Sequence, residues 1–201
     1  MIPLLLLIAA YIIGGIPFGY LLVKFQTGED VRAKGSGNIG ATNVLRTSGR
    51  MAGIATLLLD IAKGWFAVWL MARFTYDDPL WTSLAAVAVI LGHGFSIFLK
   101  FQGGKAVASY VGAFLFLAPF PLFATTIIFV LAVWRTRFIS FGSILGAALF
   151  PLAVWLIDHA PTPVILATIV CGAFIIWRHR SNLERLAAGT ENVFTFAKKS
   201  T

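Results

Sequence analysis

Charged residues and cysteine are scarce in this sequence. Asp, Glu, Lys and Arg make up 12% of the 201 residues, whereas hydrophobic residues make up 59% and the mean hydropathy is +0.88. In soluble domains about a quarter of the residues are charged, so this composition excludes a soluble domain. The one cysteine, Cys171, excludes an internal disulfide and a cysteine-based zinc site. We therefore predict a single integral membrane domain over residues 1–201.

Acidic residues are scarcer than basic ones. The chain has 8 Asp and Glu against 16 Lys and Arg, which gives a net charge of +8.

Several apolar runs approach the roughly 20 residues that a helix needs to cross a bilayer, which favours an all-α fold over a barrel of alternating strands. The opening run, residues 2–23, has no basic start and no small-residue cleavage site, so we expect a retained first span and no signal peptide.

The long apolar stretch from residue 106 to residue 134 decides the predicted topology. Pro119 and Pro121 interrupt it and disfavour a continuous helix. If the stretch is a hairpin of two short spans, each about 13 to 15 residues or about 20 to 22 Å long, all Lys and Arg except Lys63 and Arg73 fall on one side, as the positive-inside rule requires. We therefore predict a compact polytopic bundle of seven transmembrane helices, with the N-terminus outside and the C-terminus in the cytoplasm. The expected spans are 2–23, 51 to 71 or 73, 80–99, the two halves of 106–134, 138–157 and 162–177.

A polar, glycine-rich segment, residues 35–46, lies between the first two predicted spans. Glycines let backbone N–H groups approach an anion, and the planar fork of Arg46 can pair a phosphate or a carboxylate. Glycine, Asn and Thr also make ordinary turns, and the segment is neither a dinucleotide fingerprint nor a P-loop. The candidate anion-binding residues are Gly35, Ser36, Gly37, Asn38, Gly40, Thr42, Asn43 and Arg46.

Two further polar segments fall on the same predicted side. In residues 91–109 the turn of Gly103, Gly104 and Lys105 opens an apolar helix, whose N-terminus carries unsatisfied N–H groups and a positive dipole end suited to phosphate. The third segment follows the last span and contains His179, Arg180 and Asn182, with Gly189 and Glu191 beyond. Basic residues beside spans often only contact lipid headgroups. Three such segments on one face favour an anionic small-molecule or lipid substrate.

Some polar residues inside the predicted spans have two readings. Asp60 and Lys63 lie three apart on one helical face, where they can form a structural ion pair or a wall of the site. His93 can be a hydrogen-bonded structural residue or a catalytic one. Glu191 and Arg185 are expected to pair and fold the tail under the bundle.

Taken together, the three segments resemble the three motifs of the bacterial acyl phosphate:glycerol-3-phosphate acyltransferases, the PlsY family, in order and spacing over essentially the whole chain. The departures are small: Ile39 stands where proline is frequent, Ala106 where glycine is frequent, and Ser109 where threonine is frequent. The resemblance implies transfer of a fatty acyl group from acyl phosphate to the sn-1 hydroxyl of glycerol 3-phosphate, which gives lysophosphatidic acid and inorganic phosphate. It implies no use of acyl-CoA or acyl carrier protein, no cofactor and no metal.

The resemblance also implies roles for single residues. Ser36 and Arg46 would hold and polarise the substrates, and His179 and Asn182 would contact or activate the glycerol moiety, so these four are the candidate catalytic residues. The general base stays open between His179 and a substrate phosphate. His179 and Glu184 are not a dyad, because five positions on a helix turn their side chains apart. The remaining candidate substrate-binding residues are Gly103, Gly104 and Lys105 as a glycerol-phosphate cradle, Arg180, and Ser143, which can alternatively bond a neighbouring carbonyl.

Two other functions compete with the acyltransferase. A transporter of phosphate or an organophosphate would explain the basic loops, but transporters place polar binding groups near the midplane and often in repeated halves, whereas here they crowd one face. A docking protein for a soluble partner would leave Asp60, Lys63 and the Gly-Gly-Lys turn unexplained. The expected partners are the two substrates, the lipid bilayer and the enzyme that supplies acyl phosphate, with no nucleic acid. The expected location is the bacterial inner membrane, with the active site facing the cytoplasm.

Overall fold

The structure, a computed structural model, describes residues 1–194, and all regular secondary structure in that part of the chain is helical. Its elements are α1 (Ile2–Gly15), α2 (Phe18–Thr27), η1 (Val31–Ala33), α3 (Ala41–Ser48), α4 (Arg50–Thr75), α5 (Pro79–Gly94), η2 (Ile97–Leu99), α6 (Val107–Leu117), α7 (Pro119–Thr136), α8 (Ile139–Ala153), the π-helical turn η3 (Val154–Asp158), α9 (Thr162–Arg178) and α10 (Arg180–Ala187). The predicted all-α class is confirmed.

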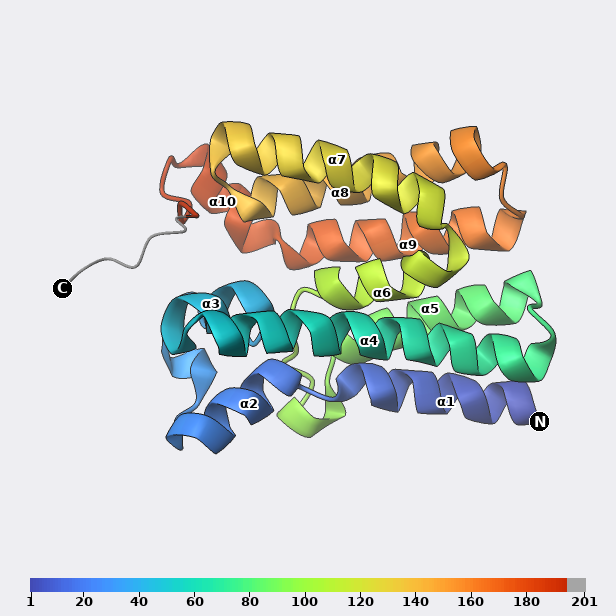
Figure 1. Ribbon diagram of the computed structural model, residues 1–201, viewed down its shortest axis with the longest axis horizontal. Helices are drawn as coiled ribbons and strands as arrows, with labels where there is room; N and C mark the ends of the chain where they lie inside the picture. Colours follow the sequence, from blue (N-terminus) through green and yellow to red (C-terminus); the bar gives the residue numbers. More distant parts are fainter. Residues whose placement is uncertain (195–201) are drawn as a thin grey trace.

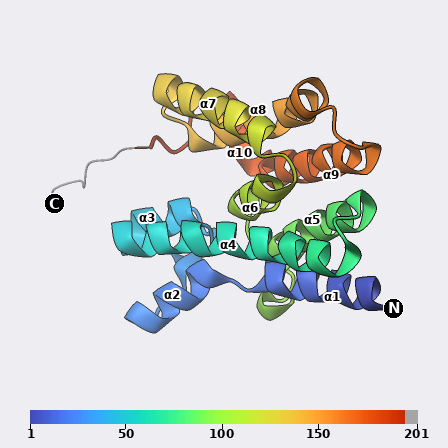
Figure 2. The ribbon, with the colours of Figure 1, turned by 45° about the vertical axis from the view of Figure 1, so that its right-hand side comes forward.

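The helices form two groups joined through α6. One group contains α1, α4 and α5, with α2 and α3 at one end, and the other contains α7, α8 and α9 (Figures 1 and 2). Helix α6 lies between them and packs most extensively on α4. Two glycines allow this close approach, since a Cβ atom on Gly64 would lie 2.1 Å from the Ser109 carbonyl oxygen and one on Gly112 would lie 1.9 Å from the Ile61 carbonyl oxygen.

Within residues 1–194, five helical segments are long and apolar enough to cross a membrane, or six if the bent pair of α9 and α10 is counted as one span. The first of them, Ile2–Thr27, contains α1 and α2 and is longer than the predicted span 2–23. It breaks at Ile16 and Pro17, where proline cannot donate to the helical ladder. Helix α6 has 11 residues, about 16 Å of helix, which underspans the hydrocarbon core. The count of seven spans therefore stays a prediction.

The chain reverses at Ala118, as the two prolines indicated. Helix α7 runs in the opposite direction to α6 (Figure 1). Pro119 occupies the first turn of α7, where a backbone N–H would have no partner within the helix, so its absence is not destabilising. The predicted length of about 13 to 15 residues for each half was wrong, because α6 has 11 residues and α7 has 18. Only α6 is short.

The third predicted span, 80–99, agrees with a candidate membrane span over Pro79–Leu99. Its α-helix ends at Gly94, and the chain then contacts α1 before the short helix η2. The Ser96 hydroxyl donates to the Gly15 carbonyl at 2.5 Å, and the Tyr11 hydroxyl donates to the Phe95 carbonyl at 2.6 Å. The Gly15 carbonyl, freed by the break between α1 and α2, and the Tyr11 hydroxyl of α1 thus hold this segment in place.

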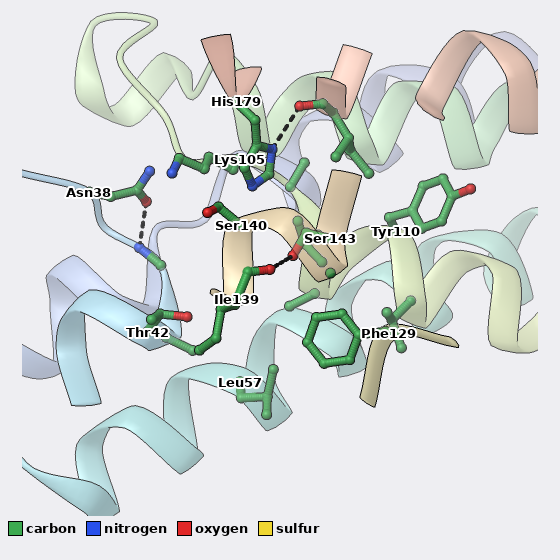
Figure 3. Close-up of a pocket in the computed structure, with 18 of the residues that line it drawn as sticks. Asn38, Thr42, Leu57, Lys105, Tyr110, Phe129, Ile139, Ser140, Ser143 and His179 are labelled. Atoms are coloured by element: carbon green, nitrogen blue, oxygen red, sulfur yellow. Dashed lines mark hydrogen bonds between the residues drawn. The ribbon is translucent and has the colours of Figure 1, made fainter. Parts of the chain in front are cut away.

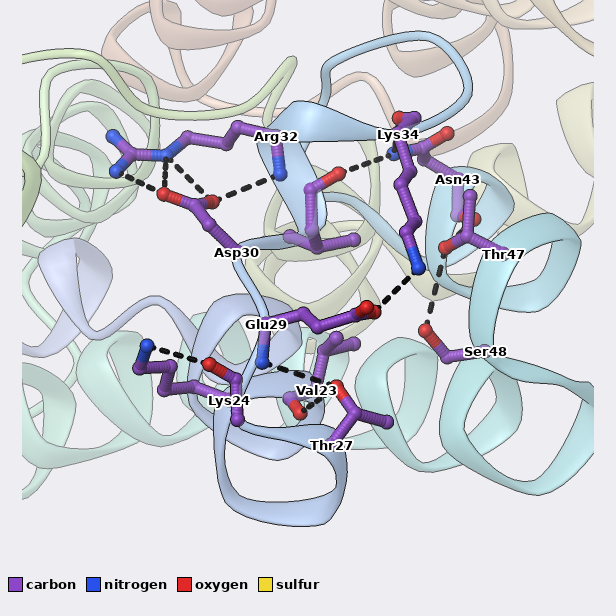
Figure 4. Close-up of polar contacts among 12 residues, drawn as sticks. Val23, Lys24, Thr27, Glu29, Asp30, Arg32, Lys34, Asn43, Thr47 and Ser48 are labelled. Carbon is purple, nitrogen blue, oxygen red and sulfur yellow. Dashed lines mark hydrogen bonds and ion pairs between the residues drawn. The ribbon is translucent and has the colours of Figure 1, made fainter.

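The connection between α2 and α4 contains two short helices, η1 and α3, and is held by local hydrogen bonds and ion pairs. Gly28 ends α2 in the left-handed region with φ 72°, and Asp30 begins η1 by accepting from the Arg32 backbone N–H at 2.9 Å. The Arg32 guanidinium also pairs with the Asp30 carboxylate, and Lys34 pairs with Glu29 (Figure 4). These contacts fix the approach to α3.

Candidate active site

One cavity of about 510 Å³ receives residues from all three polar segments (Figure 3). It opens between α3, α4, α6, α7, α8 and the start of α10. Its polar end is lined by Ser36, Asn38, Thr42, Asn43, Arg46, Lys105, Ser140, Ser143, His179, Asn182, Arg185 and Glu191. Its apolar remainder includes Ile54, Leu57, Ile61, Val107, Val111, Leu122, Phe129, Ile139 and Ala147. A ligand with a charged head and a long apolar tail fits this division.

Asn43 holds the first polar segment together. Its buried Nδ2 donates to the carbonyls of Val31, Lys34 and Asn38 at 3.2, 3.1 and 2.8 Å, and its Oδ1 accepts from the Ser36 N–H at 2.8 Å. With its donors and one acceptor occupied, Asn43 acts as a scaffold although it borders the cavity.

The glycines of this segment serve the turn more than the cavity. Gly35 and Gly37 adopt φ 61° and 70°, which favours glycine, and neither lines the cavity. Gly40 does line it, and its N–H donates to the Asn38 side chain at 2.8 Å.

Ser36 and Arg46 lie at the exposed rim of the polar end. Thr42 and Arg46, four residues apart on α3, share one helical face, and both line the cavity. The two side chains that the resemblance assigned to substrate polarisation are therefore both exposed and both border the cavity.

Gly103 and Gly104 are not brought into the cavity. Their N–H groups donate to the Gly94 and His93 carbonyls, both at 3.1 Å, and their own carbonyls accept from the Arg178 guanidinium at 2.7 and 3.0 Å. These two N–H groups already bond carbonyls of the chain, so they are not available to bind a phosphate in this structure. A Cβ atom on Gly104 would lie 2.3 Å from His93 Nε2. The two glycines instead allow the close packing that places Lys105.

Lys105 stands at one end of a chain of polar side chains that links two of the segments. Its amine donates to Asn182 Oδ1, Asn182 Nδ2 donates to Glu191 Oε1 at 2.9 Å, and Arg185 Nε donates to Glu191 Oε2 at 3.0 Å. The expected pairing of Arg185 with Glu191 is confirmed. Burial lowers the pKa of the Lys105 amine to about 8; nearby Glu191 opposes this, and the guanidinium groups of Arg185, Arg178 and Arg46 add to it.

Glu191 is a cavity residue that the sequence reasoning treated only as structural. It borders the polar end and orients both Asn182 and Arg185. It follows Asn182 by nine positions, beyond the end of α10, so no helical spacing could have placed it there.

His179 is buried and neutral at physiological pH. Its Nδ1 lies 2.8 Å from the Ile175 carbonyl oxygen. A carbonyl can only accept, so Nδ1 carries the proton and Nε2 keeps its lone pair. In Figure 3 the second ring nitrogen is directed into the cavity. Desolvation, with the positive charge of Lys105 next, lowers the pKa of His179 to about 4, and the bond to Ile175 opposes this shift.

Ser143 and Arg180 have local partners. The Ser143 hydroxyl borders the cavity and donates to the Ile139 carbonyl at 2.9 Å, which is the alternative expected for a serine in a membrane helix. Arg180 is exposed outside the cavity lining, with its guanidinium 4.9 Å from the centre of the Trp177 ring.

Below the polar end lies a buried ionic group. The Lys63 amine is 2.8 Å from Asp60 Oδ1 and donates to the Ile16 carbonyl at 2.7 Å. His93 Nδ1 lies 3.2 Å from the Ser109 hydroxyl and 3.7 Å from Asp60 Oδ1. Asp60 and His93 line the cavity, so the ion pair is also part of its wall.

Comparison with known proteins agrees with this geometry. Residues 4–189 match the family model described as "Glycerol-3-phosphate acyltransferase". A curated protein of that name from Geobacter sulfurreducens is 46% identical over 95% of this chain and 97% of its own, and one from Geobacter metallireducens is 48% identical over 96% and 98%.

Two crystal structures of PlsY, described as an integral membrane glycerol 3-phosphate acyltransferase, have similar folds. The glycerol 3-phosphate form superimposes with a TM-score of 0.92 at 33% identity, and the lysophosphatidic acid form with 0.89 at 32%. Each comparison covers 97% of this chain and 96% of the other.

Proposed function

The chain belongs to the glycerol-3-phosphate acyltransferase family, and from this membership we propose that it transfers a fatty acyl group from acyl phosphate to the sn-1 hydroxyl of glycerol 3-phosphate. The products are lysophosphatidic acid and inorganic phosphate. One observation carries the proposal: the three motifs meet at the basic end of a cavity whose remainder is apolar. Such a cavity takes a phosphate head and an acyl tail together.

The basic residues bind the two phosphate groups that the substrates bring. Arg46 pairs one of them through its planar fork, helped by Ser36, and Lys105 supplies a point charge for the other. The acyl chain lies against Leu57, Val111 and Phe129 in the apolar part of the cavity. This arrangement orients the activated carbonyl toward the glycerol hydroxyl, and orientation supplies much of the rate.

His179 orients the attacking hydroxyl. With its pKa lowered to about 4, it is a weak base, but its Nε2 accepts a hydrogen bond from the glycerol hydroxyl. As the hydroxyl oxygen bonds to the carbonyl carbon, its proton passes to a substrate phosphate oxygen, and the bond between that carbon and the leaving phosphate breaks. The Lys105, Asn182 and Glu191 chain keeps the polar groups in place.

The acyl donor gives the direct test of this function. The purified protein is expected to form lysophosphatidic acid and release phosphate from palmitoyl phosphate only when glycerol 3-phosphate is present. It is expected to show no turnover with palmitoyl-CoA. Mass spectrometry of the lipid product measures this, with an Arg46→Ala variant as the control for contaminating acyltransferases. Equal rates with both donors contradict the proposed donor, and counterflow of glycerol 3-phosphate in liposomes without chemistry would instead support a transporter.

We also propose that α6 and α7 each cross the membrane, so that seven spans put the N-terminus outside and the active site at the cytoplasmic face of a bacterial inner membrane. The alternating directions of α1, α4, α5, α6, α7, α8 and α9 in Figure 1 support this, as does the gathering of basic segments at one end.

Cysteine labelling tests this topology. In a Cys171→Ala background, cysteines at the exposed positions Asp77 and His159 are expected to react with an impermeant maleimide in intact cells, and those at Glu29 and Arg135 only after lysis. Reaction at Arg135 in intact cells would show that α6 and α7 do not both cross.

A further inference from the structure

Ser140 is a buried hydroxyl without a partner. It occupies the first turn of α8, is 6% exposed, and its Oγ has no hydrogen-bond partner among the described residues. It lines the polar end of the cavity, and in Figure 3 its hydroxyl is directed toward the region of Lys105 and Asn38. A buried hydroxyl without a partner has lost its hydrogen bonds to water, so a ligand that accepts from it recovers part of that desolvation cost.

Neighbouring hydroxyls show why Ser140 differs. Ser143 donates to a carbonyl one turn back, and Thr125 does the same with Pro121 at 3.0 Å. Ser140 has no such helical turn behind it, because the chain bends at Arg137 with φ 63° just before α8 begins. Its hydroxyl therefore stays available to the cavity.

The N-terminus of α8 adds to the effect of the hydroxyl. No side chain caps this helix of 15 residues among those described, and its first N–H groups have no carbonyl within the helix to bond. The positive end of the helix dipole therefore lies beside Ser140. Ile139 and Ser140 line the cavity, and in Figure 3 they lie between Lys105 and Asn38 on one side and Leu57 and Phe129 on the other.

We infer that the Ser140 hydroxyl donates a hydrogen bond to the carbonyl oxygen of the acyl phosphate and stabilises the oxyanion formed there. This inference rests on the proposed function and deepens it. The carbonyl joins the charged head to the apolar tail, so it lies at the boundary where Ser140 is found. When the glycerol oxygen bonds to the carbonyl carbon, the carbonyl π electrons move to its oxygen. They return as the bond to the phosphate leaving group breaks.

Ser140→Ala tests the inference by moving activity and stability in different directions. Losing one oxyanion donor lowers kcat by about 100- to 1,000-fold in other enzymes, and we expect a loss of this order, with little change in KM for glycerol 3-phosphate. The free protein should unfold at the same or a higher temperature, because a buried unpaired group has been removed. Ser83→Ala is the matched control, since its hydroxyl is also buried without a partner among the described residues but does not line the cavity, and its kcat should stay near that of the wild type.

Ser140→Thr and Ser140→Val provide a second pair of nearly equal shape that differs in the hydroxyl. The threonine variant should exceed the valine variant in kcat by a similar factor. Equal kcat values in the two, or a Ser140→Ala kcat within about threefold of wild type, overturn the inference. So does a loss of activity matched by a fall in unfolding temperature, which would make Ser140 structural, or an effect confined to KM for glycerol 3-phosphate. Wild-type protein that makes no lysophosphatidic acid from acyl phosphate would overturn the proposed function instead.

Discussion

Activity is expected to fall steeply as the pH rises above about 8, because the Lys105 amine then loses its charge. Its pKa is lowered to about 8, so the amine is protonated and able to bind phosphate below that pH and is neutral above it. The kcat/KM for glycerol 3-phosphate reports groups of the free enzyme and should decrease about tenfold per pH unit, to roughly one hundredth of its plateau at pH 10. The substrate phosphate does not obscure this, since its second pKa is about 6.

Lys105→Arg provides the control for this pH profile. A guanidinium stays protonated throughout the range, so the fall near pH 8 should disappear even if the plateau is lower, because arginine cannot reproduce the compact charge of lysine. Initial rates between pH 6 and 10, at glycerol 3-phosphate concentrations below KM, measure both proteins. If the Lys105→Arg variant keeps the inflection near pH 8, another group causes the pH dependence, and the proposed role of Lys105 in phosphate binding is contradicted.

That residues of the three polar segments would meet in one place could be predicted from the sequence, because it follows from the topology. Once Pro119 and Pro121 were read as a reversal, the number of crossings placed residues 35–46, Lys105 and His179 at the same end of the bundle, and the structure brings Ser36, Arg46, Lys105, His179 and Asn182 to one cavity. That inference needed only the direction of each helix and the distribution of basic residues.

Backbone bonding was not predictable in the same way. The turn at Gly103 and Gly104 has the composition of an anion loop, but its N–H groups bond carbonyls that the end of α5 exposes. Such a partner depends on where α5 stops, at Gly94 and not near residue 99, and helix ends are poorly fixed by apolar content. Ser140 was missed for a related reason, since the two serines of α8 differ only in whether a helical turn precedes them.

Breaking the buried ion pair is expected to cause the largest loss of stability. Asp60 and Lys63 are 2% and 5% exposed, so Lys63→Met leaves a carboxylate without its counter-charge and the Ile16 carbonyl without its donor. Removing one partner of such a pair costs about 3 to 5 kcal/mol. Unfolding of the detergent-solubilised protein by titrated SDS measures the change. Arg73→Met, which removes an exposed cation near the other end of α4, is the control and should change stability little. Exposed ion pairs contribute less than about 1 kcal/mol to stability. A loss as small as that for Lys63→Met would contradict the claim that burial makes this pair costly to break.

The double variant Asp60→Leu, Lys63→Met separates the two readings of this pair. With neither charge present, most of the lost stability should return, because apolar residues of similar size often replace a buried pair without cost. The part that does not return, about 1 to 3 kcal/mol, belongs to the unpaired Ile16 carbonyl. Asp60 lines the cavity, yet its Oδ1 faces Lys63 at 2.8 Å and His93 at 3.7 Å, so we expect kcat to stay within about tenfold, or about 1.4 kcal/mol, of wild type. A stable double variant whose kcat falls by much more would instead place the Asp60 carboxylate in the chemistry of the site.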